Sequence, residues 1–208
     1  MTARPVAVLI GPPGAGKSTV GPLLAALLGA GFTETDQMVE EAAGKPVSDI
    51  FITDGEPAFR DLERAAVARA LDQRPGILAL GGGAVMDPQT RERLAGHRVV
   101  YLRTGFAAAV RRVGLDSPRP LLLVNPRGRM RELLDERLPV YESLARITVI
   151  TDDRDPQEIA DEIAAAVTAR IAAAAGEGAG TGPEDGEWAG EEEDGGAGRP
   201  PGPPATAP

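Results

Sequence analysis

The phosphate-binding pattern G-x-x-x-x-G-K-S/T occurs near the start of the chain, as Gly11-Pro12-Pro13-Gly14-Ala15-Gly16-Lys17-Ser18-Thr19. Small residues in such a loop let backbone N–H groups face phosphate oxygens, and the following helix points its positive end at the same anion. Lys17 would reach the β- and γ-phosphates as a point charge, and the Ser18 hydroxyl would bind Mg²⁺. The loop therefore predicts a nucleoside triphosphate with Mg²⁺ as ligand. The predicted contacts are Gly14, Ala15, Gly16, Lys17, Ser18 and Thr19.

Phosphoryl transfer also needs a bound acceptor and usually a carboxylate near the attacking hydroxyl group. Asp36 could be that carboxylate, because it follows a predicted strand, but it could equally cap the next helix. Arg60 could hold an anionic acceptor, since its planar guanidinium matches a carboxylate with two hydrogen bonds. On a helix that also bears Glu56 and Glu63, an arginine is more often part of a surface ion pair. The residues alone leave both alternatives open.

Two further arginines and a glycine run could likewise bind a ligand or have a purely structural or solvent-exposed role. Arg137 could bind the acceptor or satisfy carbonyl groups at a helix end. Arg119 could reach the γ-phosphate or remain in solvent. The run Gly81-Gly82-Gly83 could present backbone N–H groups to a hydroxylated ligand or be a plain turn. His97, the only histidine, is expected at the surface.

The apolar pattern predicts strands and helices in alternation. Buried strands are expected at 6–10, 32–35, 77–80, 99–102 and 147–150. The first helix is expected to run from the phosphate loop to Gly29, and a further helical stretch is expected to start at Val47. The other helices are expected at 37–43, 56–71, 88–94, 106–113, 129–137 and 156–173. Pro139 is predicted to interrupt a helix, and residues 114–128 to form a surface loop.

Alternating strands and helices predict an α/β fold with a parallel sheet covered by helices on both faces. Ligands of such sheets bind beyond the carboxyl ends of the strands. The phosphate loop, Asp36 and the glycine run each follow a predicted strand. We therefore expect all three to converge at one edge of the sheet.

Negative charge is concentrated near the end of the chain. Residues 176–208 hold eight acidic residues and one arginine, so −7 of the net charge of −9 lies there. Their Gly-, Pro- and Glu-rich composition predicts a disordered tail, which includes Trp188, the only tryptophan. The net charge argues against nucleic acid or an anionic membrane as a partner. The absence of cysteine excludes disulfides, thiolate zinc sites and cysteine nucleophiles, and the absence of a signal-like or membrane-length apolar segment predicts a cytoplasmic protein.

In their order, these motifs resemble one family, the shikimate kinases. The phosphate loop is followed by Glu34-Thr35-Asp36, Phe51-x-x-x-Gly55-Glu56-x-x-Phe59-Arg60-x-x-Glu63, Leu80-Gly81-Gly82-Gly83-Ala84, Arg119-Pro120-Leu121-Leu122 and Arg137-x-Pro139-x-Tyr141. The resemblance implies a P-loop kinase domain over residues 1–175, of the nucleoside-monophosphate-kinase type. Such a domain has a five-stranded parallel sheet, here with a substrate-binding lobe at about 37–64 and a lid at about 116–128.

The activity implied by the resemblance is transfer of phosphate from ATP to the 3-hydroxyl of shikimate, on the route to chorismate and aromatic amino acids. We expect ATP and shikimate as partners of a monomer. The implied catalytic residues are Asp36, Lys17 and Arg119. The implied shikimate contacts are Asp36, Arg60, Gly81, Gly82, Gly83 and Arg137, and the further ATP contacts are Arg112, Arg119, Arg154 and Pro156. Glu34 replaces the family's usual Asp and has a side chain that is longer by one methylene group. The resemblance implies that Glu34 contacts Mg²⁺ through water.

Two other functions compete with this interpretation. A nucleotide kinase of the same fold, similar to adenylate kinase, would share the phosphate loop, but nothing else here favours a second nucleotide pocket. An ATP-binding module without turnover could act through the acidic tail. The presence of Lys17, Ser18, Asp36 and all three candidate arginines argues against such a module.

Overall fold

A computed structural model describes residues 4–114 and 126–177 of the chain. Five strands form one sheet in the order β2-β3-β1-β4-β5, and every neighbouring pair is parallel. The strands are β1 Pro5–Ile10, β2 Phe32–Glu34, β3 Gly76–Ala79, β4 Val99–Arg103 and β5 Ile147–Ile150. The predicted strands are confirmed, with ends that differ by at most one residue.

Helices follow the strands as the apolar pattern predicts. They are α1 Lys17–Leu27, α2 Thr35–Ala43, α3 Val47–Thr53, α4 Gly55–Gln73, α5 Pro88–Leu94, α6 Phe106–Arg112, α7 Pro126–Leu144 and α8 Pro156–Glu177, with a short 3₁₀ turn at Ala84–Met86. None of the described helices is long and apolar enough to cross a membrane.

The predicted interruption at Pro139 is wrong, because α7 continues through it to Leu144. A proline inside a helix removes one backbone hydrogen bond. The residues around Pro139 compensate for this loss: Tyr141 is fully buried, and Leu138 and Val140 pack against the same core. Helix α7 is described from Pro126, so residues 126–128 of the predicted loop are helical.

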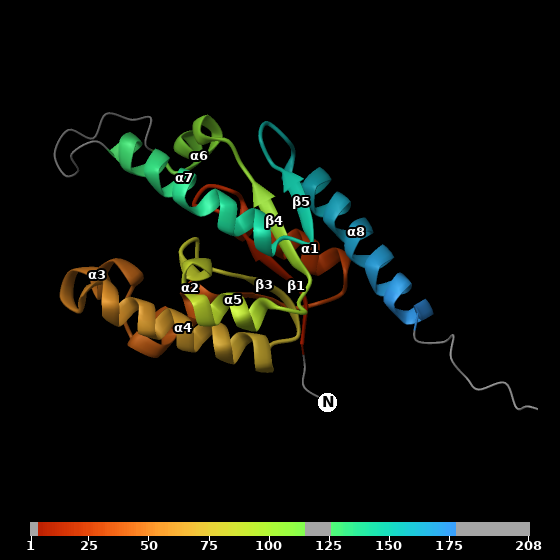
Figure 1. Cartoon of the computed structure of the whole chain (residues 1–208), viewed down its shortest axis with the longest axis horizontal. Coiled ribbons are helices and arrows are strands. Elements are labelled where there is room, and N and C mark those ends of the chain that lie inside the picture. The colour runs from red at the N-terminus through yellow and green to blue at the C-terminus, as the bar shows by residue number, and fades with distance from the viewer. Residues whose placement is uncertain (1–3, 115–125, 178–208) are drawn as a thin grey trace, which may run out of the picture.

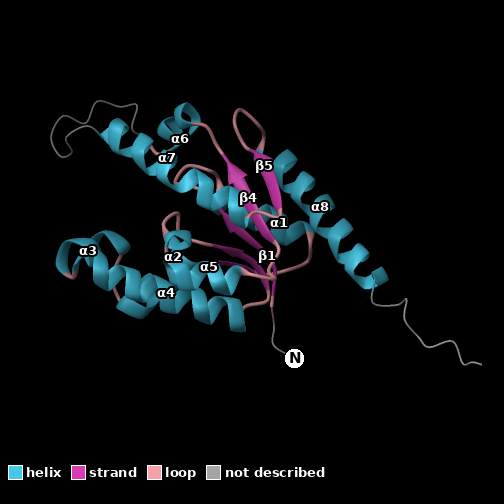
Figure 2. Cartoon of the chain, in the orientation of Figure 1, coloured by secondary structure: helices cyan, strands magenta, loops and turns pink. Residues whose placement is uncertain are grey.

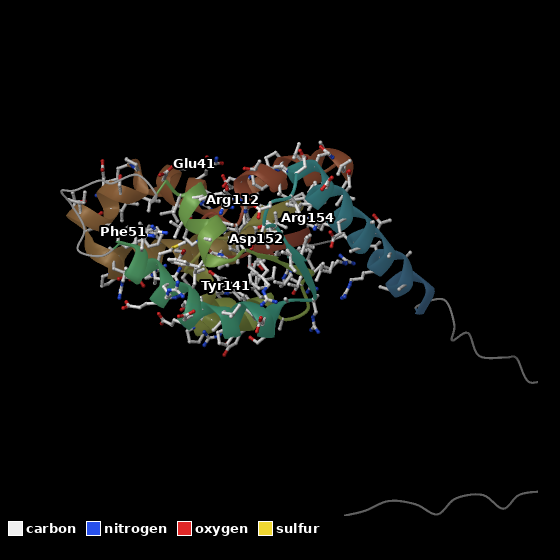
Figure 3. The ribbon with its side chains drawn as sticks, turned by 90° about the horizontal axis from the view of Figure 1, so that it is seen from above. Glu41, Phe51, Arg112, Tyr141, Asp152 and Arg154 are labelled. Atoms are coloured by element: carbon white, nitrogen blue, oxygen red, sulfur yellow. The ribbon has the colours of Figure 1, made fainter. Side chains whose placement is uncertain are left out.

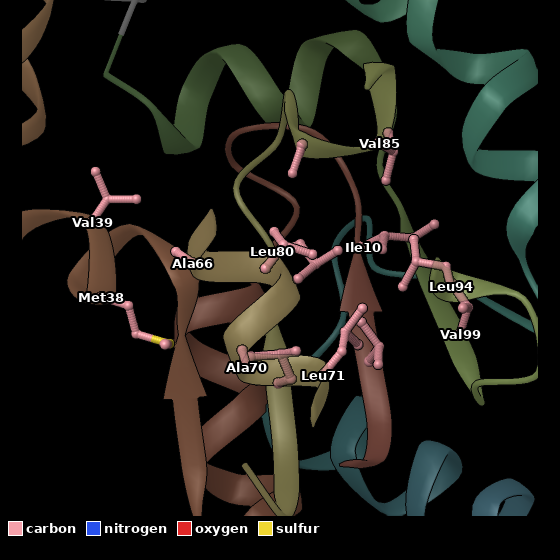
Figure 4. Close-up of a cluster of buried hydrophobic side chains, with 14 of the residues drawn as sticks. Ile10, Met38, Val39, Ala66, Ala70, Leu71, Leu80, Val85, Leu94 and Val99 are labelled. Carbon is pink, nitrogen blue, oxygen red and sulfur yellow. The ribbon is translucent and has the colours of Figure 1, made fainter. Parts of the chain in front are cut away.

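Helices cover both faces of the sheet, as Figures 1 and 2 show. On one face, α1 and α8 pack on the even-numbered residues of β4 and on Ala7 and Leu9 of β1. On the other face, α2, α3, α4, α5 and α7 contribute to a second core around Val8, Ile10 and Tyr101. Figure 4 shows part of this second core, to which Ile10, Leu80, Leu94 and Val99 belong.

The predicted substrate-binding lobe, residues 37–64, corresponds to most of α2, all of α3 and the first half of α4. Its buried residues Met38, Val39, Ile50 and Phe59 belong to the same core as the sheet. The lobe is therefore attached to the rest of the domain by continuous apolar packing. Residues 178–208 of the predicted tail lie outside the described residues, and residues 176–177 are the last residues of α8.

The strand order changes direction at β1. From β1 the chain builds β2 and β3 on one side, and then β4 and β5 on the other. Open α/β sheets bind ligands at the carboxyl ends of strands near such a switch point. The loop that follows β1 is the phosphate-binding loop, so the topology predicts a ligand site at this edge of the sheet.

Candidate active site

The phosphate-binding loop turns through glycines with positive φ between β1 and α1. Gly14 has φ 78° and Gly16 has φ 96°, values that other residues rarely adopt. A Cβ at Gly14 would also lie 2.9 Å from the backbone oxygen of Ala109, so α6 leaves no room for a side chain. The Ala15 side chain points into the core and is fully buried. The loop can therefore present backbone groups, and few side chains, to an anion.

Lys17 lies at the centre of this loop. Its ammonium donates hydrogen bonds to the backbone oxygens of Gly11 at 2.7 Å and Pro12 at 3.2 Å. Burial lowers the pKa of Lys17 to about 8, against the opposing effect of the nearby Asp36 and Glu34 carboxylates. A desolvated cation gains more from a phosphate than a hydrated one does, so the site favours an anionic ligand here.

A first cleft of about 610 Å³ opens in front of the loop. Its lining includes Gly14, Gly16, Lys17, Ser18 and Thr19 from the loop and the following helix, Glu34 at the end of β2, Asp36 in α2, Gly81 and Gly82 after β3, and Arg112 from α6. The predicted convergence of the loop, Asp36 and the glycine run is thus confirmed. The cleft is large enough for a nucleotide.

Ser18 and Glu34 form an oxygen-rich pair at the floor of the first cleft. The Ser18 hydroxyl donates to Glu34 Oε1 at 2.5 Å. In the described part of the chain, no three Asp, Glu or His side chains come together as a protein-made metal centre would need. Mg²⁺ in kinases instead takes one or two protein oxygens, waters and substrate phosphates. The hydroxyl and the carboxylate fit that second type of site.

Asp36 lies in the first turn of α2 and does not cap the helix with its side chain. Burial raises the pKa of Asp36, although Lys17 opposes this effect. A Cβ at Gly81 would lie 2.5 Å from Asp36 Oδ1 and 2.7 Å from Glu63 Oε1. The glycine is therefore required for the two carboxylates to approach the backbone this closely. A carboxylate with a raised pKa beside a cleft is a suitable proton acceptor.

A second cleft of about 390 Å³ lies on the other side of the glycine run, since Gly83 lines it. It receives Arg60, Glu63 and Arg137 as well. Arg60 donates to Glu63 Oε2 at 2.6 Å and to Glu56 Oε1 at 3.0 Å. The ion-pair alternative is therefore realised, but Glu63 is buried, and the guanidinium would lie 2.5 Å from a Cβ at Gly83. Arg60 is thus both paired and part of the cleft.

Arg137 is the clearest anion-binding candidate of the second cleft. Its Nε is buried and has no hydrogen-bond partner among the described residues. A buried donor without a partner costs free energy, and a ligand oxygen would satisfy it. The alternative role, which was satisfaction of helix-end carbonyls, does not fit, because α7 continues for seven residues beyond Arg137.

Two buried residues hold the glycine run in place. The Gly81 N–H donates to Thr35 Oγ1 at 3.0 Å, and the Tyr141 hydroxyl donates to the Gly82 carbonyl at 2.5 Å. Tyr141 also stacks on Tyr101 with 5.1 Å between ring centroids, and burial raises its pKa to about 12. We did not assign Thr35 and Tyr141 to the site from the sequence. Both residues belong to motifs of the family resemblance, Glu34-Thr35-Asp36 and Arg137-x-Pro139-x-Tyr141, and this could have indicated a place in the site.

The residues expected around adenine divide into two groups, and Figure 3 labels one arginine of each, Arg112 and Arg154. Arg112 lines the first cleft, donates to the Gly14 carbonyl at 3.2 Å, and donates to Thr151 after β5. Arg154 instead donates to Ile150 and Glu162, and neither Arg154 nor Pro156 lines the first cleft. Arg119, and most of the predicted lid at 116–128, lie outside the described residues.

Known proteins match the chain over most of its length. The family model for shikimate kinase matches residues 13–168. A shikimate kinase of Thermobifida fusca is 60% identical over 164 residues, which cover 79% of this chain and 95% of that protein. One of Salinispora arenicola is 58% identical over 160 residues, 77% of this chain and 96% of that protein.

A solved structure agrees with these relatives. The shikimate kinase from Acinetobacter baumannii, solved in complex with shikimate, has a TM-score of 0.74 at 36% identity, and the match covers 81% of this chain and 95% of that one. The family model, the relatives and the solved structure agree over most of the chain. The chain belongs to the shikimate kinase family.

Proposed function

We propose that this chain transfers the γ-phosphoryl group of ATP to the 3-hydroxyl group of shikimate, giving shikimate 3-phosphate and ADP. One observation carries the proposal: the run Gly81–Gly83 lies between a phosphate-binding cleft with a basic carboxylate and a second cleft in which the buried Nε of Arg137 has no hydrogen-bond partner among the described residues. An acceptor with a hydroxyl at one end and a carboxylate at the other matches this pair of clefts. The A. baumannii relative, solved with shikimate, supports the same acceptor.

At the nucleotide end, the loop N–H groups and Lys17 would bind the phosphates. The Ser18 hydroxyl, which donates to Glu34 at 2.5 Å, would hold Mg²⁺ directly. Glu34 would hold it through water, as the family resemblance implies. When bound, Mg²⁺ neutralises charge on the β- and γ-phosphates. Arg112 would lie against the nucleotide because it is fixed to both Gly14 and Thr151. Arg119, Arg154 and Pro156 remain proposed contacts from the family resemblance.

At the acceptor end, Asp36 would accept a hydrogen bond from the 3-hydroxyl. As the bond between that oxygen and the γ-phosphorus forms, the bond from the γ-phosphorus to the β,γ-bridging oxygen breaks, and the hydroxyl proton passes to Asp36. Lys17 stabilises the charge that develops on the phosphoryl oxygens. Burial makes Asp36 more basic, which favours proton transfer near neutral pH.

Arg137 and Arg60 would hold the shikimate carboxylate. The free Nε of Arg137 supplies one buried donor. Arg60 retains Glu63 and Glu56 as partners, and these two acids keep its planar group fixed against the cleft. The remaining N–H groups of a fixed guanidinium can then bind a carboxylate with little loss of side-chain freedom.

Release of ADP, measured with shikimate, with AMP and with ATP alone, tests the proposal. We expect release that depends on shikimate, and a product whose phosphorus NMR signal couples to the ring proton at C3. Stimulation by AMP instead would assign the chain to nucleotide kinases. Saturable ATP binding with no acceptor-dependent release would indicate a binding module without turnover.

A further inference from the structure

A cluster of basic side chains lies at the end of the sheet opposite the two clefts. A cavity of about 270 Å³ there is lined by Arg4 before β1, Leu71 and Asp72 at the end of α4, and Arg93, Ala95 and His97 between α5 and β4. All these segments lie at the amino ends of the strands. This cavity is therefore separate from the nucleotide and acceptor clefts, which lie at the carboxyl ends.

Arginines precede four of the five strands at this end. Arg4, Arg74, Arg98 and Arg146 stand one or two residues before β1, β3, β4 and β5. Within the described residues none of the four makes an ion pair or a side-chain hydrogen bond. Arg93 has one distant partner, Asp72, at 3.7 Å. We name Arg4, Arg74, Arg93, Arg98 and Arg146 the basic edge.

Basic side chains outnumber acidic ones in the lining of this cavity. Asp72 is the acidic residue that lines the cavity, and it is largely exposed, with 65% of its side chain accessible. His97 faces the same surroundings: burial lowers its pKa, Arg4 lowers it further, and Asp72 opposes them. The positive potential at this end contrasts with the net charge of −9 of the whole chain.

The acidic charge that could balance it follows α8. Helix α8 packs on α1 and β5 and runs back along the sheet, so that its carboxyl end lies beyond the amino ends of the strands, as Figure 1 shows. The chain continues from there with a net charge of −7 over residues 176–208, including the run Glu191-Glu192-Glu193-Asp194. A Gly-rich random coil of about fifteen residues has a root-mean-square span of about 20 Å, and a five-stranded sheet is about 20–25 Å wide. The acidic run is thus within reach of the basic edge.

We propose that the basic edge is the docking surface for the acidic carboxyl-terminal segment of this same chain. A tethered segment has an effective concentration of about millimolar, so several weak ion pairs suffice to hold it. The contact needs no fixed backbone conformation, since charge alone drives it. Docking would cover the arginines of the basic edge and so keep other polyanions away from them.

Trp188 provides a direct probe, because it is the only tryptophan and lies three residues before the acidic run. We expect its fluorescence anisotropy in the full-length protein to be high at about 0.01 M salt and to fall at about 0.15 M, as the Debye length shrinks from about 30 Å to about 8 Å. The value should not depend on protein concentration. A salt-independent anisotropy would overturn the proposal, and a concentration-dependent one would assign the segment to a second copy.

Charge variants identify the surface. The double variant Arg4→Gln with Arg93→Gln should bring the low-salt anisotropy down to the high-salt value. The control, Lys45→Gln with Arg111→Gln, removes two charges from the α2–α3 connection and from α6, and should leave it unchanged. Equal effects of the two double variants would mean that net charge, not the basic edge, matters, and would refute the docking site.

A second measurement uses the acidic run. Replacing Glu191, Glu192, Glu193 and Asp194 by their amides in the full-length protein should expose the basic edge, so that the variant is eluted from heparin at higher salt than the wild type. Adding Arg4→Gln and Arg93→Gln to this variant should reverse the gain. A gain that persists in the combined variant would show that heparin binds elsewhere, against the proposal.

Discussion

Gly81→Ala tests whether the position of Asp36 matters for the reaction. The added Cβ would lie 2.5 Å from Asp36 Oδ1, whereas carbon–oxygen contacts under 3.0 Å essentially never occur. The carboxylate must therefore move by about 0.5–1 Å, and a displacement of that size can cost about 10²-fold in rate. We expect kcat to fall about 10- to 100-fold, while ATP binding, which uses the other side of the cleft, is retained.

A matched control and a double-mutant cycle test whether the effect of Gly81→Ala acts through Asp36. In Gly31→Ala the nearest atom to the new Cβ is the Pro75 oxygen at 4.0 Å, so kcat should stay within about twofold of the wild type. If Gly81→Ala acts through Asp36, adding it to Asp36→Asn should cost little more than Asp36→Asn alone. Wild-type kcat in Gly81→Ala, or full additivity in the double variant, would refute the proposed role of Asp36.

Four further outcomes follow from the same geometry. Asp36→Asn removes the proton acceptor, so kcat should fall by about 10²–10⁴-fold with ATP affinity retained in a direct titration, and a loss under about threefold would exclude this role. Arg60→Lys should raise the shikimate KM almost as much as Arg60→Ala, because lysine lacks the planar guanidinium group. Each substitution should weaken transition-state binding by about 2–5 kcal/mol. Changes within about 1 kcal/mol in both variants would mean that Arg60 forms only a surface ion pair. Because Lys17 must be charged to bind phosphate and has a pKa of about 8, kcat/KM for ATP should decline as pH rises through 8, and a flat profile from pH 7 to about 9.5 would contradict the lowered pKa. Truncation after Glu177 should leave kcat/KM and Tm unchanged at about 0.15 M salt, where exposed charges are screened; a clear loss of either would mean that the tail packs on the catalytic domain.

The sequence was sufficient for the features that depend on local pattern and on parallel topology. The phosphate loop follows a strand and precedes a helix, so its position could be predicted, and Asp36 and Gly81 were placed at the same edge for the same reason. The strand order itself required the structure. So did the continuation of α7 through Pro139, since it depends on the packing of Tyr141, which no local pattern reveals.

The side-chain partners of the candidate site could not be predicted, because they join distant parts of the chain. Thr35 meets Gly81 across 46 positions, and Tyr141 meets Gly82 across 59. For Arg60, the sequence offered ion pairing and ligand binding as alternatives. The structure has the ion pairs and also places the guanidinium in the second cleft, because Glu63 is buried beside the cleft and is not on the solvent face. The monomeric state stays a prediction.

The two hydrogen bonds to the glycine run bear on the entropy of binding. Glycine loses more backbone freedom on ordering than any other residue, and a run of three would normally become ordered only when a ligand arrives. Here Thr35 holds Gly81 and Tyr141 holds Gly82, so much of this entropy is lost when the protein folds. A ligand between the two clefts then meets a run that is already ordered, and its affinity is not reduced by having to immobilise it.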